Sequence, residues 1–229
     1  MSDTAVTWLP DSAAAEETGG LRERKKRQMR ARLSATATRL FLERGFDDVR
    51  VTEIAEACGV SERTVFNYFP TKESLLLDRF DDTLTALRTA LADPGTPPLP
   101  AALAVLDTEL DGLTAWLASQ PDPAAASETL RRFRELSTST PELRSHQHDM
   151  IDRLTETAAR LLAGRSAAPE PAPAAHIAAV ALLGLWRVQA ASLQRRLAAH
   201  HPPDRLRTLV SADVHIAAAT IEPIFRGFA

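Results

Sequence analysis

The sequence has few of the residues on which several classes of protein depend. Cys58 is its single cysteine, which excludes an internal disulfide framework and leaves no cysteine pair for a structural zinc site or a redox motif. Aromatic residues make up only 5% of the 229 residues, and β-branched runs are scarce beside the abundant alanine. This balance favours helix packing over sheets. The sequence therefore predicts an all-α protein in a reducing compartment.

Signals for export, membrane insertion and catalysis are also missing. Residues 1–20 have no basic start followed by an apolar core, so we expect no secretory leader and a cytoplasmic location. The longest largely apolar stretch, residues 174–186, is shorter than the ~20 residues of a membrane helix and is predicted to be a buried helix. No Gly-rich phosphate loop or Ser-His-Asp spacing is present. Since His146 and His148 would diverge on a helix, we expect no metal, no cofactor and no enzyme.

Hydrophobic spacing and capping residues predict about nine helices. The first covers roughly residues 27–44, and Gly45 with Phe46 ends it with a left-handed turn and an apolar contact to Phe41. Thr52 is expected to cap a second helix that ends at Gly59, and Ser61 to cap a third over residues 62–68. A fourth follows Pro70 and Thr71 to about Leu91, and Pro-rich segments separate five more, at 99–118, 124–138, 141–163, 174–199 and 203–226.

The second and third helices have the spacing of a helix-turn-helix. In that motif the second helix enters the major groove of DNA and exposes polar side chains to base edges. Turning Val65 and Phe69 inward leaves Glu62, Arg63, Thr64 and Asn67 on the outer face, with donors and acceptors suited to bases. Donors to phosphates are expected beside it, at Thr52, Ser61, Tyr68 and Lys72. There are alternatives without DNA contact. Thr52 and Ser61 would then be helix caps only, Tyr68 would be a core residue, and Arg63 would lie on a solvated helix face.

Positive charge gathers next to this motif. The net charge is -3, yet residues 21–50 hold ten Lys or Arg against four Asp or Glu. The basic run Arg22–Arg32, which includes Arg27, is either a solvated arm or an arm that contacts the DNA backbone or minor groove. Its position favours DNA contact, and such an arm is expected to be disordered without DNA.

The segment VTEIAEACGVSERTVFNYFPTKESLL resembles the signature of the TetR family of one-component repressors. The resemblance covers about residues 27–87 and implies phosphate contacts by Thr52, Ser61, Tyr68 and Lys72. It places Phe66 on the base-facing side with Glu62, Arg63 and Asn67. The family often has a tyrosine where this chain has Phe66, so the hydroxyl contact is absent and a thymine-methyl or packing role is expected instead.

The resemblance also implies a second, larger helical domain. We expect a disordered lead-in at 1–20, the DNA-binding domain at 21–87, and a ligand-binding and dimerisation domain at 88–229 whose last two helices form a homodimer. The predicted contact faces include Ile177 and Val180 on one helix and Ile216 and Ile224 on the other. Apolar residues of the middle helices are candidates for an effector pocket, although ordinary core packing is the commoner role of such residues: Leu106, Leu110, Leu113, Trp116, Phe133, Met150, Leu154 and Trp186.

These features predict a sequence-specific transcriptional regulator. The form expected from the resemblance is a homodimeric repressor that an unidentified small-molecule effector releases from palindromic double-stranded operator DNA. Three alternatives stay open: an activator or a regulator without an effector, a nonspecific architectural DNA-binding protein, and an enzyme or scaffold whose N-terminal module docks on DNA.

Overall fold

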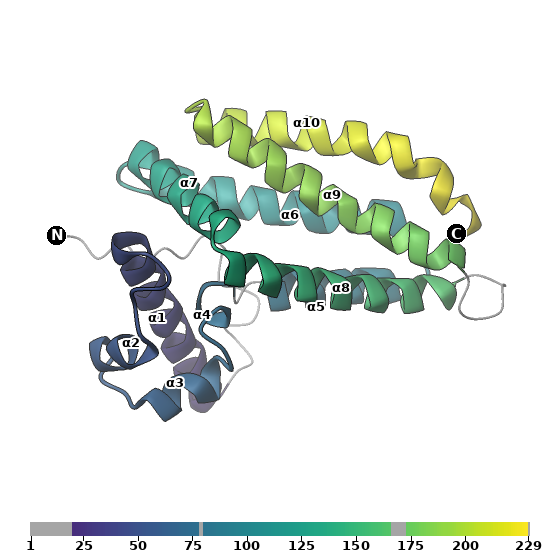
Figure 1. Ribbon diagram of the computed structural model, residues 1–229. Coiled ribbons are helices and arrows are strands. Elements are labelled where there is room, and N and C mark those ends of the chain that lie inside the picture. The colour runs from purple at the N-terminus through teal and green to yellow at the C-terminus, as the bar shows by residue number, and fades with distance from the viewer. Residues whose placement is uncertain (1–19, 78–79, 166–172, 229) are drawn as a thin grey trace. The chain divides into compact units, whose positions relative to one another are not determined.

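The computed structural model describes residues 20–77, 80–165 and 173–228 of the chain, and these form helices joined by turns and loops, with no strand among them (Figure 1). The all-α prediction is confirmed. The helices are α1 (Leu21–Arg44), α2 (Val51–Ala57), α3 (Glu62–Tyr68), α4 (Ser74–Leu77), α5 (Phe80–Ala92), α6 (Pro98–Ser119), α7 (Pro123–Ser139), α8 (Pro141–Ala163), α9 (Pro173–Ala198), α10 (Pro203–Ile221) and the 3₁₀ turn η2 (Glu222–Gly227).

Proline starts every long helix of the C-terminal part. Each of α6, α7, α8, α9 and α10 has proline as its first residue. Proline suits this position because its ring holds φ near the helical value and its missing N–H would have had no partner in the first turn. The Pro-rich segments therefore separate the helices, as the sequence predicts, and also supply the first residue of the helix that follows.

Three sequence-based expectations about the N-terminal helices are wrong. The basic run forms the first turns of α1, which begins at Leu21 because the carbonyl of Gly20 accepts the N–H groups of Glu23 and Arg24. Helix α2 starts at Val51 with Arg50 before it, so Thr52 stands in the first turn and is not the cap. The helix expected to start after Pro70 at Thr71 begins only at Ser74, as α4, and α5 follows from Phe80; residues 78–79 between them lie outside the described chain.

The chain divides into two compact units, of residues 1–78 with 132–146, and 79–131 with 147–229. The lead-in at 1–19 lies outside the described residues. In the first unit, Leu33 and Phe41 of α1 pack with Ile54 of α2 and Val65 of α3. Segment 132–146 joins this core through Leu143, which is fully buried. Its Arg132 donates to the carbonyl of Leu42 at 2.6 Å.

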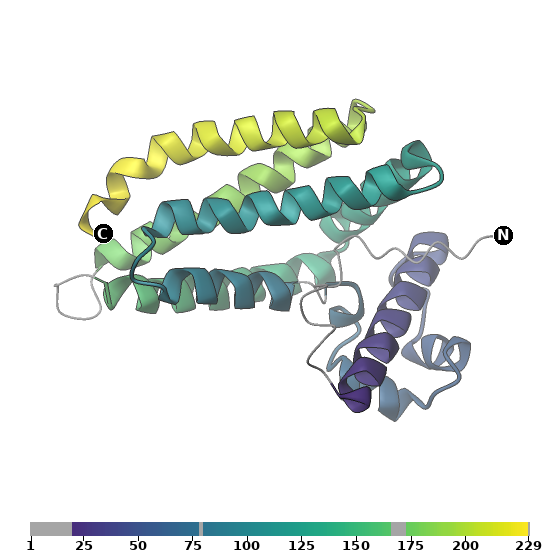
Figure 2. The same ribbon diagram turned by 180° about the vertical axis from the view of Figure 1, so that it is seen from behind.

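The second unit is a bundle of long helices. Helices α9 and α10 run antiparallel side by side, and so do α5 and α6 (Figures 1 and 2). Helix α10 also packs against α6. The core contains Leu87 of α5, Leu106 of α6, Leu162 of α8, Leu182 of α9 and Val214 of α10. Each of these side chains is at most 2% exposed, so the unit has a closed apolar interior.

The last two helices are apolar over a longer stretch than the 13 residues, 174–186, singled out in the sequence. Residues 173–198 and 203–227 are long and apolar enough to cross a membrane by length and composition, with mean hydropathy 1.4 and 1.2. Core helices of soluble proteins meet the same criterion. Only 33% and 22% of these apolar windows are buried within one chain, so much of their surface is left uncovered.

Candidate DNA-binding surface and effector groove

The turn between α2 and α3 depends on Gly59. Its φ is +64°, a left-handed conformation that glycine adopts without the steric cost of a side chain. The N–H of Gly59 donates to Glu56 and that of Val60 donates to Ala55, both at 3.0 Å. These two bonds close the end of α2 and turn the chain towards α3. The predicted glycine turn is confirmed.

Helix α3 is capped at its start and amphipathic along its length. The Ser61 hydroxyl accepts the backbone N–H of Thr64 at 3.2 Å, which confirms the predicted cap. Val65 is fully buried on the inner side. The predicted base-facing residues Glu62, Arg63, Phe66 and Asn67 are exposed, and Thr64 is half-buried.

Phe66 is the unusual member of this face. Its side chain is 43% exposed, and it is one of only six large hydrophobic side chains exposed among the described residues. Exposing a phenyl ring on a helix that is otherwise polar outside costs solvation free energy unless a partner covers it. An apolar contact with a thymine methyl group would provide such cover.

An ion pair braces the start of the motif. Arg44 at the end of α1 lies 2.6 Å from the Glu53 carboxylate of α2 and also donates to the carbonyl of Asp48. The Glu53 carboxylate accepts the N–H of Arg50 as well, at 3.0 Å. The Arg44 and Arg50 hydrogen bonds lower the pKa of Glu53. Helix α2 is therefore held at its N-terminus to the end of α1.

The predicted phosphate-binding side chains lie around α3. Ser61 and Thr52 are exposed in or just before the first turns of α3 and α2, where backbone N–H groups have no helical partner. Tyr68 is half-buried at the end of α3. Lys72 follows Pro70, and its ammonium lies over the rings of Phe46 and Phe41. Arg27 is exposed on α1.

Arg30 is a positioning residue that the sequence did not single out. Its guanidinium donates to the carbonyl of Tyr68 at 3.1 Å and lies 4.8 Å from the centroid of the Phe69 ring. Arg30 thus ties α1 to the end of α3. No local pattern distinguishes it from the other basic residues of the run, because its partners lie about forty positions away. Cys58 is buried beside Thr36, as expected of a small core residue.

The predicted effector-pocket residues do not gather at one place. Leu106 and Leu154 belong to the core of the second unit, and Leu110 is also buried. Phe133 packs in the first unit. Leu113, Trp116, Met150 and Trp186 are half-buried.

Three arginines of α7 lie close together in the sequence, and the first of them, Arg131, pairs with Glu128 at 2.7 Å. Burial lowers the pKa of Arg134 to about 10. Arg132 donates to a backbone carbonyl of α1.

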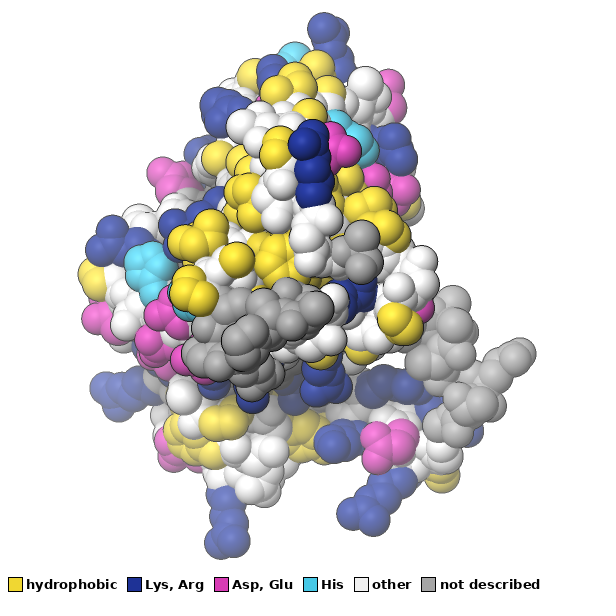
Figure 3. Space-filling model, turned by 90° about the vertical axis from the view of Figure 1, so that its right-hand side faces the viewer, with side chains coloured by type: hydrophobic (Ala, Val, Ile, Leu, Met, Phe, Trp, Pro, Cys, Tyr) yellow, Lys and Arg dark blue, Asp and Glu magenta, His cyan; other side chains and the backbone are white. Residues whose placement is uncertain are grey.

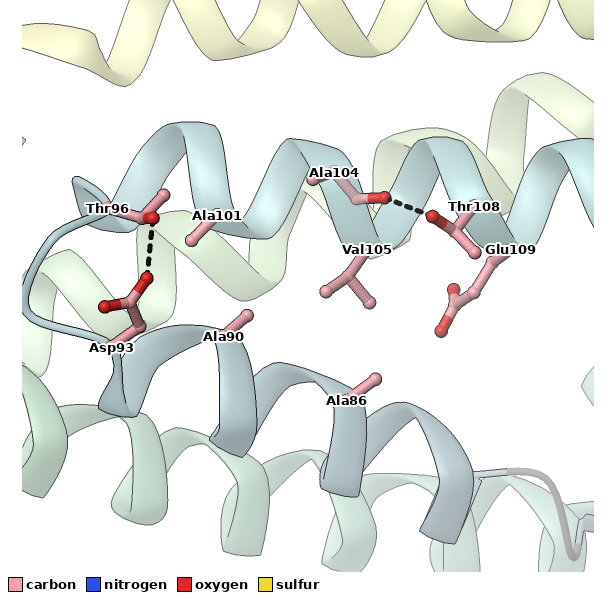
Figure 4. A pocket seen from close by; sticks show the side chains of 9 residues that line it. All are labelled: Ala86, Ala90, Asp93, Thr96, Ala101, Ala104, Val105, Thr108 and Glu109. Atoms are coloured by element: carbon pink, nitrogen blue, oxygen red, sulfur yellow. Dashed lines mark hydrogen bonds between the residues drawn. The ribbon is translucent and has the colours of Figure 1, made fainter. Parts of the chain in front are cut away.

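A groove of about 360 Å³ lies between α5 and α6 of the second unit (Figure 4). Small apolar side chains line its length: Ala86, Ala90, Ala101, Ala104 and Val105. Its polar lining residues are Asp93, Thr96, Thr108 and Glu109. Figure 4 shows Asp93 and Glu109 at opposite ends of the groove. None of the residues predicted for an effector pocket lines it.

Glu109 joins three helices at one end of this groove. Its carboxylate accepts the hydroxyl of Thr83 from α5 at 2.5 Å and the indole N–H of Trp186 from α9 at 3.1 Å. Burial raises the pKa of Glu109 despite these two hydrogen bonds. The sequence offers one indication of its position: Ala101, Val105 and Glu109 follow at intervals of four and therefore share one face of α6. In the structure Ala101 and Val105 are buried on that face.

Exposed apolar side chains concentrate on the last helices. Four of the six exposed large hydrophobic residues in the described chain are Ile177, Val180, Ile216 and Ile224. Figure 3 faces the end of the bundle where α9 begins and α10 ends, and yellow hydrophobic side chains reach the surface there. By contrast, the Leu206 and Val210 side chains of α10 are buried within the chain.

The sequence is similar to known transcription regulators. Residues 33–78 match the model of the bacterial regulatory proteins of the tetR family. The chain is 33% identical over 150 residues to the HTH-type transcriptional regulator TcmR of Streptomyces glaucescens, covering 58% of this chain and 66% of TcmR. It is 29% identical over 136 residues to the transcriptional regulator MftR of Mycobacterium tuberculosis, covering 58% of this chain and 64% of MftR. It thus spans slightly less than two thirds of both relatives.

Among solved structures, the chain fold is similar to that of Thermus thermophilus FadR, a TetR-family transcriptional repressor in complex with lauroyl-CoA. The identity is 23%, the TM-score is 0.43, and the match covers 87% of this chain and 95% of FadR. With so low a TM-score, the structural similarity carries no argument about function.

Proposed function

We propose that this protein, whose residues 33–78 match the tetR family model, is a homodimeric, sequence-specific transcriptional repressor that a small molecule releases from its operator. One observation carries the DNA-binding part. Helix α3 is fixed by the Ser61 cap and the Gly59 turn, and it exposes Arg63, Phe66 and Asn67 on one continuous face. A rigid helix with donors, acceptors and an apolar ring outside suits the base edges of a major groove.

Each candidate base contact has its own chemistry. Arg63 presents a guanidinium for the two acceptors of guanine, and Asn67 presents an amide for adenine. Glu62 accepts from cytosine, while Thr64 and Phe66 offer methyl and ring contacts to thymine. Thr52, Ser61, Tyr68, Lys72 and Arg27 would hold the flanking phosphates and set the register of α3 in the groove.

The dimer part of the proposal rests on the uncovered faces of α9 and α10. Ile177, Val180, Gly184 and Arg187 follow one another at three- and four-residue spacing along α9, and none of them is buried. Ile216 on α10 is 69% exposed. A second copy packed on these faces removes the apolar surface from water and forms a four-helix bundle. Two recognition helices about 34–36 Å apart then read a palindrome.

Repression and its release follow from two states of the dimer. One state spaces the two α3 helices to fit the operator, and the effector binds more tightly to another state that does not fit. A cytoplasmic location and the absence of a catalytic role complete the proposal. An activator of the same architecture would bind the same DNA and differ only in its effect on transcription.

Selection of bound duplexes from a random pool tests this function. The full-length chain should enrich a palindrome whose half-sites lie one helical turn apart, and DNase protection should span both halves. Reporter transcription in vitro should fall when the selected site overlaps a promoter. Recovery of unrelated sequences with equal affinity at matched salt would instead indicate a nonspecific DNA-binding protein and would overturn the proposal.

A further inference from the structure

We propose that the effector is a small amphipathic molecule with an ammonium or amidinium group, bound in the α5–α6 groove with its cation on Glu109. This inference rests on the proposed function, because it names the effector class for that regulator. It starts from the composition of the groove. The nine lining residues include two carboxylates and two hydroxyls but no Lys, Arg or His.

The shape of the groove follows from its alanines. Helices α5 and α6 pack through leucines such as Leu87 and Leu106 on their core side. On the other side Ala86, Ala90 and Ala104 present only methyl groups, so the helices leave space between them. Ala101 and Val105 form a buried apolar floor. A volume of about 360 Å³ is near the lower end for pockets that bind small molecules.

The state of Glu109 indicates the charge of the occupant. Both donors to its carboxylate, the Thr83 hydroxyl and the Trp186 indole, are neutral. No cationic side chain pairs with Glu109 in the part of the chain that the structure describes. A carboxylate accepts about four hydrogen bonds, so about two acceptor positions stay open after these two contacts. A desolvated carboxylate with neutral partners attracts a cation that also donates hydrogen bonds.

The far end of the groove adds a second negative group. Asp93 accepts the N–H of Gly95 at 3.0 Å and the hydroxyl of Thr96 at 2.8 Å, which hold the carboxylate in place and lower its pKa. Arg165, just beyond α8, donates to the carbonyls of Leu91, Asp93 and Thr96, and its positive charge contributes to the lowered pKa of Asp93. Arg165 offsets the charge of Asp93, so the preference for a cation over an anion comes from the Glu109 end of the groove.

The site also connects three helices. A ligand cation on Glu109 shares its carboxylate with the Thr83 hydroxyl of α5 and the Trp186 indole of α9, so binding changes the strength of both hydrogen bonds. Helix α5 begins at Phe80, two residues after Asp78, where the N-terminal segment of the first unit ends. Helix α9 carries the proposed dimer face. Occupancy of one groove thus acts on the segment that leads to the DNA-binding unit and on a helix of the dimer.

A matched set of probes tests the charge selectivity. 4-Phenylbutylammonium, 4-phenylbutanol and 4-phenylbutyrate share one apolar body and carry positive, zero and negative charge. Isothermal titration on the full-length protein without DNA should give an ammonium affinity about tenfold above that of the alcohol, with no binding of the carboxylate. Equal affinities, tighter binding of the carboxylate, or no ammonium binding at about 10 mM overturn the inference.

Two variants with matched controls locate the site. Glu109→Gln keeps the shape and removes the charge, so it should lower the ammonium affinity about tenfold and leave the alcohol unchanged, whereas Glu156→Gln on α8 should change neither. Ala104 is exposed on the groove rim, and Ala104→Leu should abolish binding of both probes. Ala118→Leu, exposed on the same helix outside the groove, should not. Unchanged binding in Glu109→Gln or Ala104→Leu contradicts the site.

The two proposals fail in different ways. If the full-length protein selects a palindrome but does not bind the ammonium probe, only the proposed effector class is wrong. Ammonium binding in a protein that selects no DNA sequence contradicts the regulator function and leaves the groove as a binding site.

Discussion

The ammonium nitrogen of Lys72 lies 4.3 Å from the centroid of the Phe46 ring. Phe46 itself packs on Phe41 of α1, with 5.0 Å between the ring centroids. The lysine is therefore held over an aromatic pair at the end of α1, just beyond the proposed recognition helix α3. A cation positioned before DNA arrives loses less conformational entropy when it contacts a phosphate.

Lys72→Ala should weaken binding to all duplexes by a similar factor. A phosphate contact carries no sequence information, so the slope of log affinity against log salt should shrink by about one. Fluorescence anisotropy titrations at several salt concentrations measure this. Lys72→Arg keeps the charge and serves as the control. A salt slope equal to that of the parent protein would exclude a phosphate contact.

Arg63→Ala should relax base preference at one position of each half-site. Loss of a bidentate contact to guanine costs about 1–3 kcal/mol on the preferred duplex and much less on a duplex with another base there. Competition binding with single-base variants of the selected site resolves the position. A uniform loss on all duplexes would reassign Arg63 to the backbone.

Ser61 has two separable roles, as helix cap and as phosphate donor. Ser61→Ala removes the hydrogen bond to the Thr64 N–H and should lower the free energy of unfolding by about 1 kcal/mol. Ser61→Asp retains a capping oxygen but adds a negative charge, so stability should stay near that of the parent while DNA affinity falls. Urea denaturation and anisotropy measure the two effects. Parent-like DNA binding by Ser61→Asp would leave Ser61 as a cap alone.

Glu109 should make its own contribution to the pH dependence of stability. Burial raises its pKa, so the folded protein retains a proton at pH values where the unfolded chain has lost it. Stability from this group is thus present below the unfolded pKa and falls as pH rises through the folded pKa. The unfolding free energy of Glu109→Gln minus that of the parent should increase as the pH rises from the pKa of an unfolded glutamate to the higher pKa of folded Glu109. Parallel curves would contradict the desolvation of the Glu109 carboxylate, and Glu156→Gln is the control.

Ile216→Glu should convert the proposed dimer into monomers. The side chain is 69% exposed in a single chain, so the monomer fold tolerates a charge, whereas burying it between two copies does not. Sedimentation velocity measures the mass, and binding to the full palindrome should fall with it. Ala124→Glu, exposed at the start of α7, is the control. A parent-like mass for Ile216→Glu would move the interface elsewhere.

The sequence by itself determined the helix-turn-helix, because its geometry depends on neighbouring residues. The Gly59 turn, the Ser61 cap and the inward position of Val65 result from interactions within a few positions of the chain. The same holds for the proline starts of α6 to α10. The errors at Thr52 and in the basic run are errors of helix boundary, where nearby residues compete for the same role.

Tertiary structure alone decided the rest. Leu143 joins the core of the first unit, and Thr83, Glu109 and Trp186 meet although up to 103 positions separate them. Only packing tells an apolar residue of a pocket from one of a core, so the predicted pocket residues scattered while alanines formed the groove. Helical spacing specifies which side chains share a face. Which helix covers that face depends on contacts between distant parts of the chain.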